Sequence, residues 1–464
     1  MAWCGADITL ARVGPSGHSQ LARMGVQHHH YSCDVPSQQW EKMLHTPQMW
    51  PLSFEVVQVA FSSSHFAVVT ASGRLYTAGW NDRGQLGRAN ASCQYAHALG
   101  RVSLPRGAAE SVACGPRNML VVFKQATGVR SVFGCGCNCE KQLPGDVQTE
   151  WAMRAVNLQP FTGTGKPWAA QGVTVRVAVG QDFTVFAVGG TIGAMGTKAP
   201  GMPAGSRCTV FPALLRDRVD VKHLVAGCSH VLAGAVDNGL LRVWGWGDNR
   251  CYQLGFHDEF QVLSAPTEIV FGCPQLPSND FSSMLAAWDR HSVIMVNGNV
   301  WTCGEHDHTT SSLAHLRELA NATCRVQQID PAHFDNLPVA HVSVGKRHAA
   351  FVTTCGRLYV RGFSGKRNEF HNGNGLPTGV RESRRGVVGL CRQTTLVQPV
   401  LVPAKVLGDR ECGVTRMCDA KKVAFCMAMH RRLGSASFLA HVDCHVVKMI
   451  LDFADALFPS LVKP

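Results

Sequence analysis

A single pattern of apolar and polar positions returns along the chain. It consists of a short β-branched run, a small-residue turn ending in His or a substitute, a second apolar run, a Gly turn, and an aromatic residue before another Gly. The clearest copies are VAFSSSHFAVVTASGRLYTAGWNDRGQLG from Val59 and LVAGCSHVLAGAVDNGLLRVWGWGDNRCYQLG from Leu224. Short apolar runs separated by such turns are typical of antiparallel strands joined by hairpins. The pattern therefore predicts an all-β fold.

Seven copies align on one column, which is formed by His65, Asn118, Phe183, His230, His291, His348 and Lys421. Successive members are 47 to 73 residues apart, with a mean of about 59. That period suits a four-stranded propeller blade with its loops better than a helical repeat. The sequence predicts a seven-bladed β-propeller with its repeats in residues 51–433. A His that recurs in one column is expected to serve repeated packing rather than catalysis.

These motifs resemble those of the regulator of chromosome condensation family. The resemblance rests on the G-x-x-H turn, on the strands that begin G-R-L-Y at Gly73 and G-L-L-R-V-W at Gly239, and on the N-D-R-G-Q-L-G tail from Asn81. It covers about residues 1–430. It implies a seven-bladed propeller in which an N-terminal strand completes the last blade. It also implies, as an activity of the founding relatives, guanine-nucleotide exchange on a small GTPase.

The two ends of the chain are expected to differ from the repeats. MAWCGAD at residues 1–7 matches WTCGEHD at residues 301–307, so residues 1–14 are predicted to be the closing strand of the last blade. Residues 15–50 are polar and are expected to form an irregular loop. Residues 434–464 form a C-terminal extension with a short helix over 437–458, capped by Ser435 or Ser437 and stopped by Pro459.

The chain has 464 residues and a formal net charge of +12. Residues 1–340 hold 25 basic and 24 acidic side chains, whereas residues 341–464 hold 19 and 8. Much of this excess lies in or beside a Gly- and Arg-rich insertion at 363–400. Its cations are the candidate partner-binding residues: Arg361, Lys366, Arg367, Arg381, Arg384, Arg385 and Arg392. Two interpretations stay open, a solvated face and a surface for an acidic protein or nucleic acid.

Motifs for catalysis, cofactors and metals do not stand out. The sequence contains no G-x-x-x-x-G-K-[ST], H-E-x-x-H or G-x-S-x-G, so we expect no enzymatic catalysis and no cofactor. CGCNC from Cys135 is expected to be a tight turn rather than a metal cluster. With 19 Cys, no apolar leader and no spanning segment, a soluble intracellular protein with reduced thiols is expected. The sequence leaves cytoplasmic, nuclear and mitochondrial locations open.

Two functions from different classes remain. The first is a non-enzymatic protein-interaction scaffold, which rigid propellers with varied loops provide. The alternative is an exchange factor, for which Asp182 is the candidate GTPase contact, since it falls at the third-blade turn that contacts the GTPase Ran in family exchangers. The 47-residue interval from Phe183 to His230 is the shortest between copies and holds no protruding wedge. The sequence therefore favours the scaffold and predicts no exchange on Ran-type GTPases.

Overall fold

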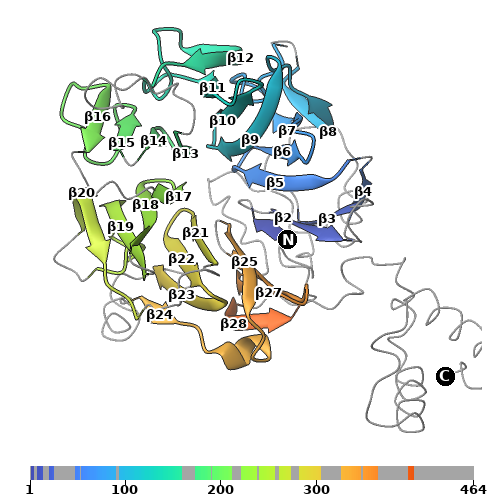
Figure 1. Cartoon of the computed structure of the whole chain (residues 1–464), viewed down its shortest axis with the longest axis vertical. Helices are drawn as coiled ribbons and strands as arrows, with labels where there is room; N and C mark the ends of the chain where they lie inside the picture. The colour runs from blue at the N-terminus through green and yellow to red at the C-terminus, as the bar shows by residue number, and fades with distance from the viewer. Residues whose placement is uncertain are drawn as a thin grey trace, which may run out of the picture.

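The computed structural model of the chain is built almost wholly from strands. It describes residues 2–4, 8–13, 20–25, 48–52, 54–89, 93–158, 173–189, 191–211, 221–237, 240–256, 261–272, 282–304, 326–345, 348–363 and 395–401. Within these ranges lie seven four-stranded antiparallel sheets. Figure 1 shows the sheets arranged around a common axis. The prediction of an all-β propeller is confirmed.

The strands run in consecutive order within each sheet. The N-terminal sheet comprises β1 (Ala2–Cys4), β2 (Ile8–Val13), β3 (Gln20–Gly25) and β4 (Gln48–Pro51). The first repeat sheet comprises β5 (Val56–Phe61), β6 (His65–Thr70), β7 (Leu75–Trp80) and β8 (Tyr95–Arg101). The second comprises β9 (Gly107–Cys114), β10 (Asn118–Gln125), β11 (Arg130–Cys137) and β12 (Thr149–Val156). The third comprises β13 (Val175–Val179), β14 (Thr184–Val188), β15 (Thr191–Met195) and β16 (Cys208–Phe211).

The remaining three repeat sheets follow the same order. The fourth comprises β17 (Val221–Ala226), β18 (His230–Asp237), β19 (Leu240–Asp248) and β20 (Val262–Ile269). The fifth comprises β21 (Ser283–Ala287), β22 (His291–Val296), β23 (Asn299–Gly304) and β24 (Gln327–Gln328). The sixth comprises β25 (Val339–Val344), β26 (His348–Thr353), β27 (Leu358–Phe363) and β28 (Thr395–Leu401), and the short 3-10 helix η3 (Pro331–Phe334) precedes it.

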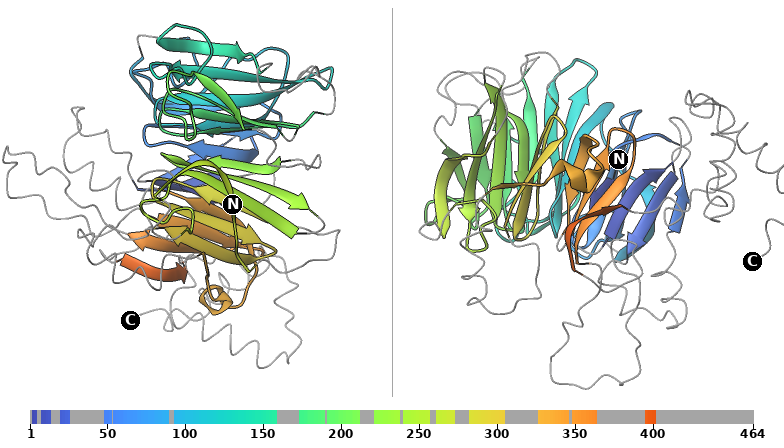
Figure 2. Two further views of the ribbon diagram at one scale, coloured as in Figure 1. Left: turned by 90° about the vertical axis from the view of Figure 1, so that its left-hand side faces the viewer. Right: turned by 90° about the horizontal axis from the view of Figure 1, so that it is seen from below.

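Each repeat sheet places its first strand at the centre of the ring and packs its face against the next sheet. The strand β5 contacts β9, β13 contacts β17, β17 contacts β21, and β21 contacts β25. The second strands are the most buried: every residue of β6, β14, β22 and β26 is buried. Apolar side chains from neighbouring sheets share each cluster, as Leu120 of β10 does with Val177 of β13. Seen edge-on, the strands run between the two faces of the ring (Figure 2).

The N-terminal segment differs from its prediction. Whether residues 1–14 complete a blade begun by the copy at Thr415 stays a prediction, because that copy lies outside the described residues. Within the described residues, β1 pairs with β2, β2 with β3 and β3 with β4 in one sheet. Two of those strands lie in residues 15–50, where an irregular loop was expected. Pairing neighbours in sequence closes short loops, which costs less entropy than joining the two ends of the chain. The strand β1 contacts β5 on one side and β25 and β26 on the other.

Several predicted features lie outside the described residues. They are the seventh repeat copy from Thr415, most of the insertion at 363–400 and the C-terminal helix. No helix in the described part of the chain is long and apolar enough to cross a membrane.

The aligned column marks the start of the second strand of the sheet. His65, Asn118, His230, His291 and His348 are the first residues of β6, β10, β18, β22 and β26. Each pairs with a glycine of the third strand, as His230 does with Gly247. Gly247 has φ +101°, and a Cβ there would lie 2.8 Å from the His230 Cα. Only glycine allows this positive φ and this close approach, which explains the recurring aromatic-to-Gly signature.

Candidate functional site

One face of the ring gathers the turns that the sequence pattern singles out. In an antiparallel sheet the loop between the first and second strands lies at the same end as the loop between the third and fourth. The loop at 62–64 therefore shares a face with the turn from Asn81, and the β6–β7 hairpin at 71–74 lies on the opposite face. We call these the hollow face and the hairpin face.

A polar hollow of about 540 Å³ opens on the hollow face over the first three repeat sheets. The first sheet contributes Ser63, Ser64, Trp80, Asp82 and Gln85. The second contributes Pro116, Arg117, Cys137, Cys139 and Glu140, and the third contributes Gln181, Asp182 and Lys198. Hydroxyl, amide, carboxylate, thiol and cationic groups from three sheets thus converge on one depression, which is a common form of binding site.

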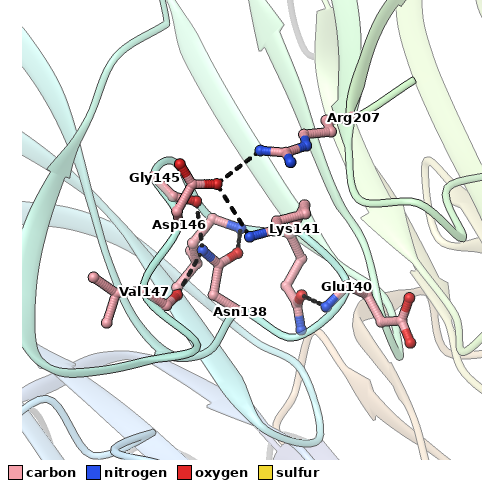
Figure 3. A network of polar contacts seen from close by, with 9 residues as sticks. Asn138, Glu140, Lys141, Gly145, Asp146, Val147 and Arg207 are labelled. Carbon is pink, nitrogen blue, oxygen red and sulfur yellow. Dashed lines mark hydrogen bonds and ion pairs between the residues drawn. The ribbon is translucent and has the colours of Figure 1, made fainter. Parts of the chain in front are cut away.

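The turns that support the hollow are built around buried asparagines. Asn138 is fully buried, and its Oδ1 accepts a hydrogen bond from the Leu143 N–H at 2.7 Å. Its Nδ2 donates to the carbonyls of Gly145 at 3.1 Å and Val147 at 3.0 Å (Figure 3). Asn81 and Asn249 receive the equivalent bonds from Leu86 and Leu254. We call these three side chains the turn hubs, because each holds its own loop together.

A glutamine completes each of these turns. The Gln142 Oε1 accepts the Glu140 N–H at 2.9 Å, and Gln85 and Gln253 accept the N–H groups of Arg83 and Cys251 in the same way. The N-D-R-G-Q-L-G motif is therefore a closed set of hydrogen bonds, and its Asn and Gln are structural. Polar groups at such depth must be paired to avoid a desolvation cost.

The third sheet replaces the hub with a charge. The hub asparagines stand two residues after Gly79, Gly136 and Gly247, and the same step from Gly196 leads to Lys198. The Lys198 Nζ lies 2.8 Å from Glu140 Oε1 and 3.3 Å from Asp182 Oδ2. The Thr197 hydroxyl also donates to Glu140 Oε2 at 2.5 Å. Lys198 therefore ties this turn to the neighbouring sheet through Glu140 as well as to its own sheet through Asp182.

The ion pairs set the charge state of the hollow. The hydrogen bond from Lys198 holds the pKa of Glu140 below its usual range, and Glu140 in turn raises the pKa of Lys198. Nearby, Arg207 of the third sheet and Lys141 of the second both bind Asp146 Oδ1, at 2.8 and 3.2 Å (Figure 3). These two cations lower the pKa of Asp146, with Arg207 the larger cause. The second and third sheets are thus joined at their surface by charge.

The histidines of the aligned column do not reach the hollow surface. His65 is fully buried, and burial lowers its pKa to about 3. Burial likewise lowers the pKa values of His230 and His348 to about 4. The Ser62 hydroxyl lies 2.9 Å from His65 Nδ1, and the Ser292 hydroxyl lies 2.9 Å from His230 Nε2. Imidazoles that stay neutral inside the sheets serve packing and hydrogen bonding.

The candidate residues from the sequence fall in two places. Asp182 lies in the hollow, with 21% of its side chain exposed, and is paired with Lys198. Arg361 lies on β27, half-buried, and burial lowers its pKa to about 10. The other six cations lie outside the described residues: Lys366, Arg367, Arg381, Arg384, Arg385 and Arg392. The structure therefore brings Asp182 together with other residues of the hollow, and of the basic set it describes Arg361 alone.

Most of the hollow was missed from the sequence. Arg117 and Gln181 stand in the G-x-x-H turns, and Lys198 stands at the hub position of its copy. Aligning the copies on the glycine after the third strand, instead of on the His column alone, identifies Lys198 as the charged exception. In the described ranges, no group of three or more His, Cys, Asp or Glu side chains could hold a metal ion.

The sheets, the His–Gly pairing and the turn hubs define a β-propeller assembled from one divergent repeat. A family model described as the regulator of chromosome condensation repeat matches residues 56–85, which run from β5 into the Asn81 turn. The match shows that this part of the chain carries a repeat of that family. The agreement between that match and the expected repeats confirms the resemblance found in the sequence.

Two curated relatives, the Regulator of chromosome condensation of Homo sapiens and that of Mus musculus, are 28% and 27% identical to this chain over 269 residues. The alignments cover 54% of this chain and 60% of each relative, so the chain spans about 60% of the length of these proteins.

Among solved structures, human WBSCR16 is similar with a TM-score of 0.56 and 19% identity, over 77% of this chain and 84% of that one. Yeast RCC1 (Prp20), in a structure with Kap60, is similar with a TM-score of 0.53 and 17% identity, over 82% and 88%. At these identities the likeness concerns the fold alone.

Proposed function

We propose that the chain is a non-enzymatic scaffold that binds a protein partner through the hollow face. The observation that carries the proposal is the charged hollow over the first three repeat sheets, with Arg117, Asp182 and Lys198 on its wall. A rigid propeller that holds such groups on short, hydrogen-bonded turns loses little entropy when a partner binds. Charges of both signs on one depression favour a partner surface that also carries both signs.

The test exchanges the positions of two charges without changing their sum. The variant Arg117→Glu with Asp182→Lys alters the hollow face, and Arg74→Glu with Asp237→Lys makes the same exchange on the hairpin face. Each tagged full-length protein is purified from its own cells, and the proteins that co-elute are quantified. We expect the hollow variant to lose at least ten-fold of a specific partner while the hairpin variant keeps it. Equal recovery of every partner by both variants would refute the proposal.

Guanine-nucleotide exchange on a small GTPase is the second candidate. It is favoured by Asp182, which lies in the hollow at the turn where family exchangers contact their GTPase. Prp20p from Saccharomyces cerevisiae, whose solved structure is similar to this chain, binds Gsp1p and histones. Against exchange, Lys198 and Arg207 of the described turn 196–207 form ion pairs with Glu140 and Asp146 of the second sheet.

We therefore expect no exchange on Ran-type GTPases. Release of a fluorescent guanine nucleotide from the GTPase of the same organism is followed with and without stoichiometric protein. An unchanged release rate supports the scaffold. A rate raised ten-fold or more, and lost in Asp182→Ala, would establish the exchange factor instead.

The basic residues of the sixth sheet and its insertion remain a proposed second contact, for an acidic protein or a nucleic acid. Replacing Arg381, Arg384 and Arg385 by Ala should weaken such binding and flatten its salt dependence. Unchanged retention on a cation exchanger and unchanged partner recovery would mark the set as a solvated face.

A further inference from the structure

One cation of the hollow has no carboxylate partner among the described residues. The Arg117 side chain lines the hollow and is exposed, and its guanidinium takes part in no ion pair or hydrogen bond within the described ranges. Its main chain is held in place, because the Arg117 carbonyl accepts the Cys137 N–H at 2.8 Å. A fixed backbone therefore presents a guanidinium that is free to bind a ligand.

The other charges of the hollow already have partners. The Lys198 Nζ lies 2.8 Å from Glu140 Oε1 and 3.3 Å from Asp182 Oδ2. The Asp82 Oδ1 accepts a hydrogen bond from the Gln85 Nε2 at 2.9 Å. Each carboxylate of the hollow thus has a donor inside the protein, and the guanidinium is the charge that a ligand must balance.

The charges around Arg117 decide which kind of anion fits. The lining holds one other cation, Lys198, and three carboxylates, those of Asp82, Glu140 and Asp182. These carboxylates would repel a phosphate monoester, which carries close to two negative charges at neutral pH. A carboxylate carries one charge, and a guanidinium binds it through two parallel hydrogen bonds. The hollow therefore favours a carboxylate at Arg117.

A small apolar pit adjoins the hollow at the middle of the ring. Its volume is about 30 Å³, and turns of five repeat sheets line it where their first strands end. Pro116 and Gln181 line both the pit and the hollow, so the two depressions are continuous. Val179 and Ala226 are apolar parts of the pit wall. There is room for about two carbon atoms, which is the end of one apolar side chain.

Trp288 gives the pit an aromatic wall. It follows β21, at a turn position that is glycine in the second, third and fourth copies: Gly115, Gly180 and Gly227. The indole packs against the apolar cluster of the fifth and sixth sheets and also against that of the first sheet. Because the fifth and first sheets are not neighbours, Trp288 lies near the axis of the ring. A rigid, half-buried indole offers apolar contact area at little entropic cost.

We propose that the partner inserts into the hollow a segment in which an aspartate or glutamate stands beside an apolar residue. Its carboxylate binds the Arg117 guanidinium, and the end of its apolar side chain fills the pit beside Trp288. Pro116 lines the pit and directly precedes Arg117, so one short segment can make both contacts. This inference rests on the proposed role of the hollow face and names the chemistry by which that face selects its partner.

The experiment selects binders from a library of random peptides of about twelve residues, displayed on phage, against the immobilised full-length protein. We expect enrichment of peptides in which Asp or Glu lies within two residues of Leu, Ile, Val or Met. The best peptide is then synthesised, and its affinity is measured by fluorescence anisotropy. Arg117→Gln should weaken its binding by about ten-fold or more, as for the loss of a charged hydrogen bond. Replacing the acidic residue of the peptide by its amide should cause the same loss and add little to that of Arg117→Gln.

Two variants separate the contacts from changes in the fold, and thermal melts check that each is folded. Arg207→Gln is the matched control, because Arg207 is paired with Asp146 and does not line the hollow, and it should leave the affinity unchanged. Ala226→Leu fills the pit and should weaken binding about ten-fold.

A selection that yields no carboxylate motif would overturn the inference. The proposed function would still stand if the selected peptides lost binding in the variant Arg117→Glu with Asp182→Lys. Peptides that bind this variant as well as the parent protein would contradict both.

Discussion

The third and fourth repeat sheets are neighbours with the same four-strand pairing, yet they hold their turns differently. In the fourth sheet, the buried His230 begins β18 and the hub Asn249 receives the Leu254 N–H at 3.0 Å. In the third sheet, Phe183 precedes β14 and Lys198 replaces the hub. The turn of the fourth sheet is closed on itself by buried hydrogen bonds. The turn of the third sheet is attached to the second sheet by exposed ion pairs.

The difference shows how a repeat can be altered for binding without losing the blade. Pairing of the strands and apolar burial fix the sheet in both cases, and Phe186 and Leu232 are fully buried at its centre. Once strand pairing and apolar burial fix the sheet, the sequence of the turn can vary. Replacing a buried amide by a lysine gives up local stability and places a charge in the hollow. The predictions below separate these two arrangements, in order of decreasing effect.

Lowering the pH should destabilise the sheets that contain buried histidines and leave the stability of the third sheet unchanged. The pKa of about 3 for His65, and of about 4 for His230 and His348, lies below the unfolded value of 6.5. The unfolded chain therefore binds more protons between these values, so stability is complete above about pH 6.5 and falls as the pH drops toward 4. Each histidine should cost roughly 2 kcal/mol at pH 5.

Chemical denaturation between pH 4.5 and 7.5 measures this loss. The variant His230→Phe copies the residue of the third sheet and should lower the pH dependence by about one proton, whatever its stability at neutral pH. If the free energy of unfolding of this variant depends on pH as steeply as that of the parent protein, the buried histidines are not the source of the pH dependence.

Removing a hub should be far more damaging than removing its charged substitute. Asn249→Ala deletes an acceptor for Leu254 and a donor to the Phe256 carbonyl, both inside the protein. Leaving these groups unpaired should lower the free energy of unfolding by about 3 kcal/mol. Urea denaturation at pH 7 measures the change, and an effect below about 1 kcal/mol would show that water replaces the hub.

Glycines with similar backbone angles should respond differently according to their neighbours. A Cβ on Gly247 would meet the Ser229 carbonyl oxygen at 2.5 Å, whereas Gly205 in the third-sheet turn has φ +76° and nothing within 4 Å. Gly247→Ala should cost about 3 kcal/mol through backbone displacement, and Gly205→Ala about 1 kcal/mol through its φ alone. Equal losses in thermal melts would contradict the role assigned to close approach.

The smallest effect is expected at Lys198. Its side chain is 58% exposed, so its ion pairs with Glu140 and Asp182 are screened by water and salt. Lys198→Ala should leave the urea midpoint within experimental error at physiological salt. A loss comparable to that of Asn249→Ala would mean that the lysine is a structural hub after all.

The repeat could be predicted from the sequence, whereas most residues of the candidate site could not. The His–Gly pairing and the N-D-R-G-Q-L-G turns follow from local hydrogen bonding, so they repeat in sequence and could be recognised there. The N-terminal sheet was missed because QLARMG of β3 lacks β-branched residues and shares no motif with the repeats. The hollow was missed because Arg117, Asp182 and Lys198 come from two sheets, and only the packing of those sheets brings them together.

The account rests most directly on the hollow face being the side that a partner covers. Amide hydrogen exchange of the full chain, alone and with the protein that co-purifies with it, measures this. The account predicts slower exchange with partner in the loops 62–64, 115–117 and 180–182, and no change in the hairpins 71–74 and 126–129. Protection of the hairpins with the loops unchanged would contradict it.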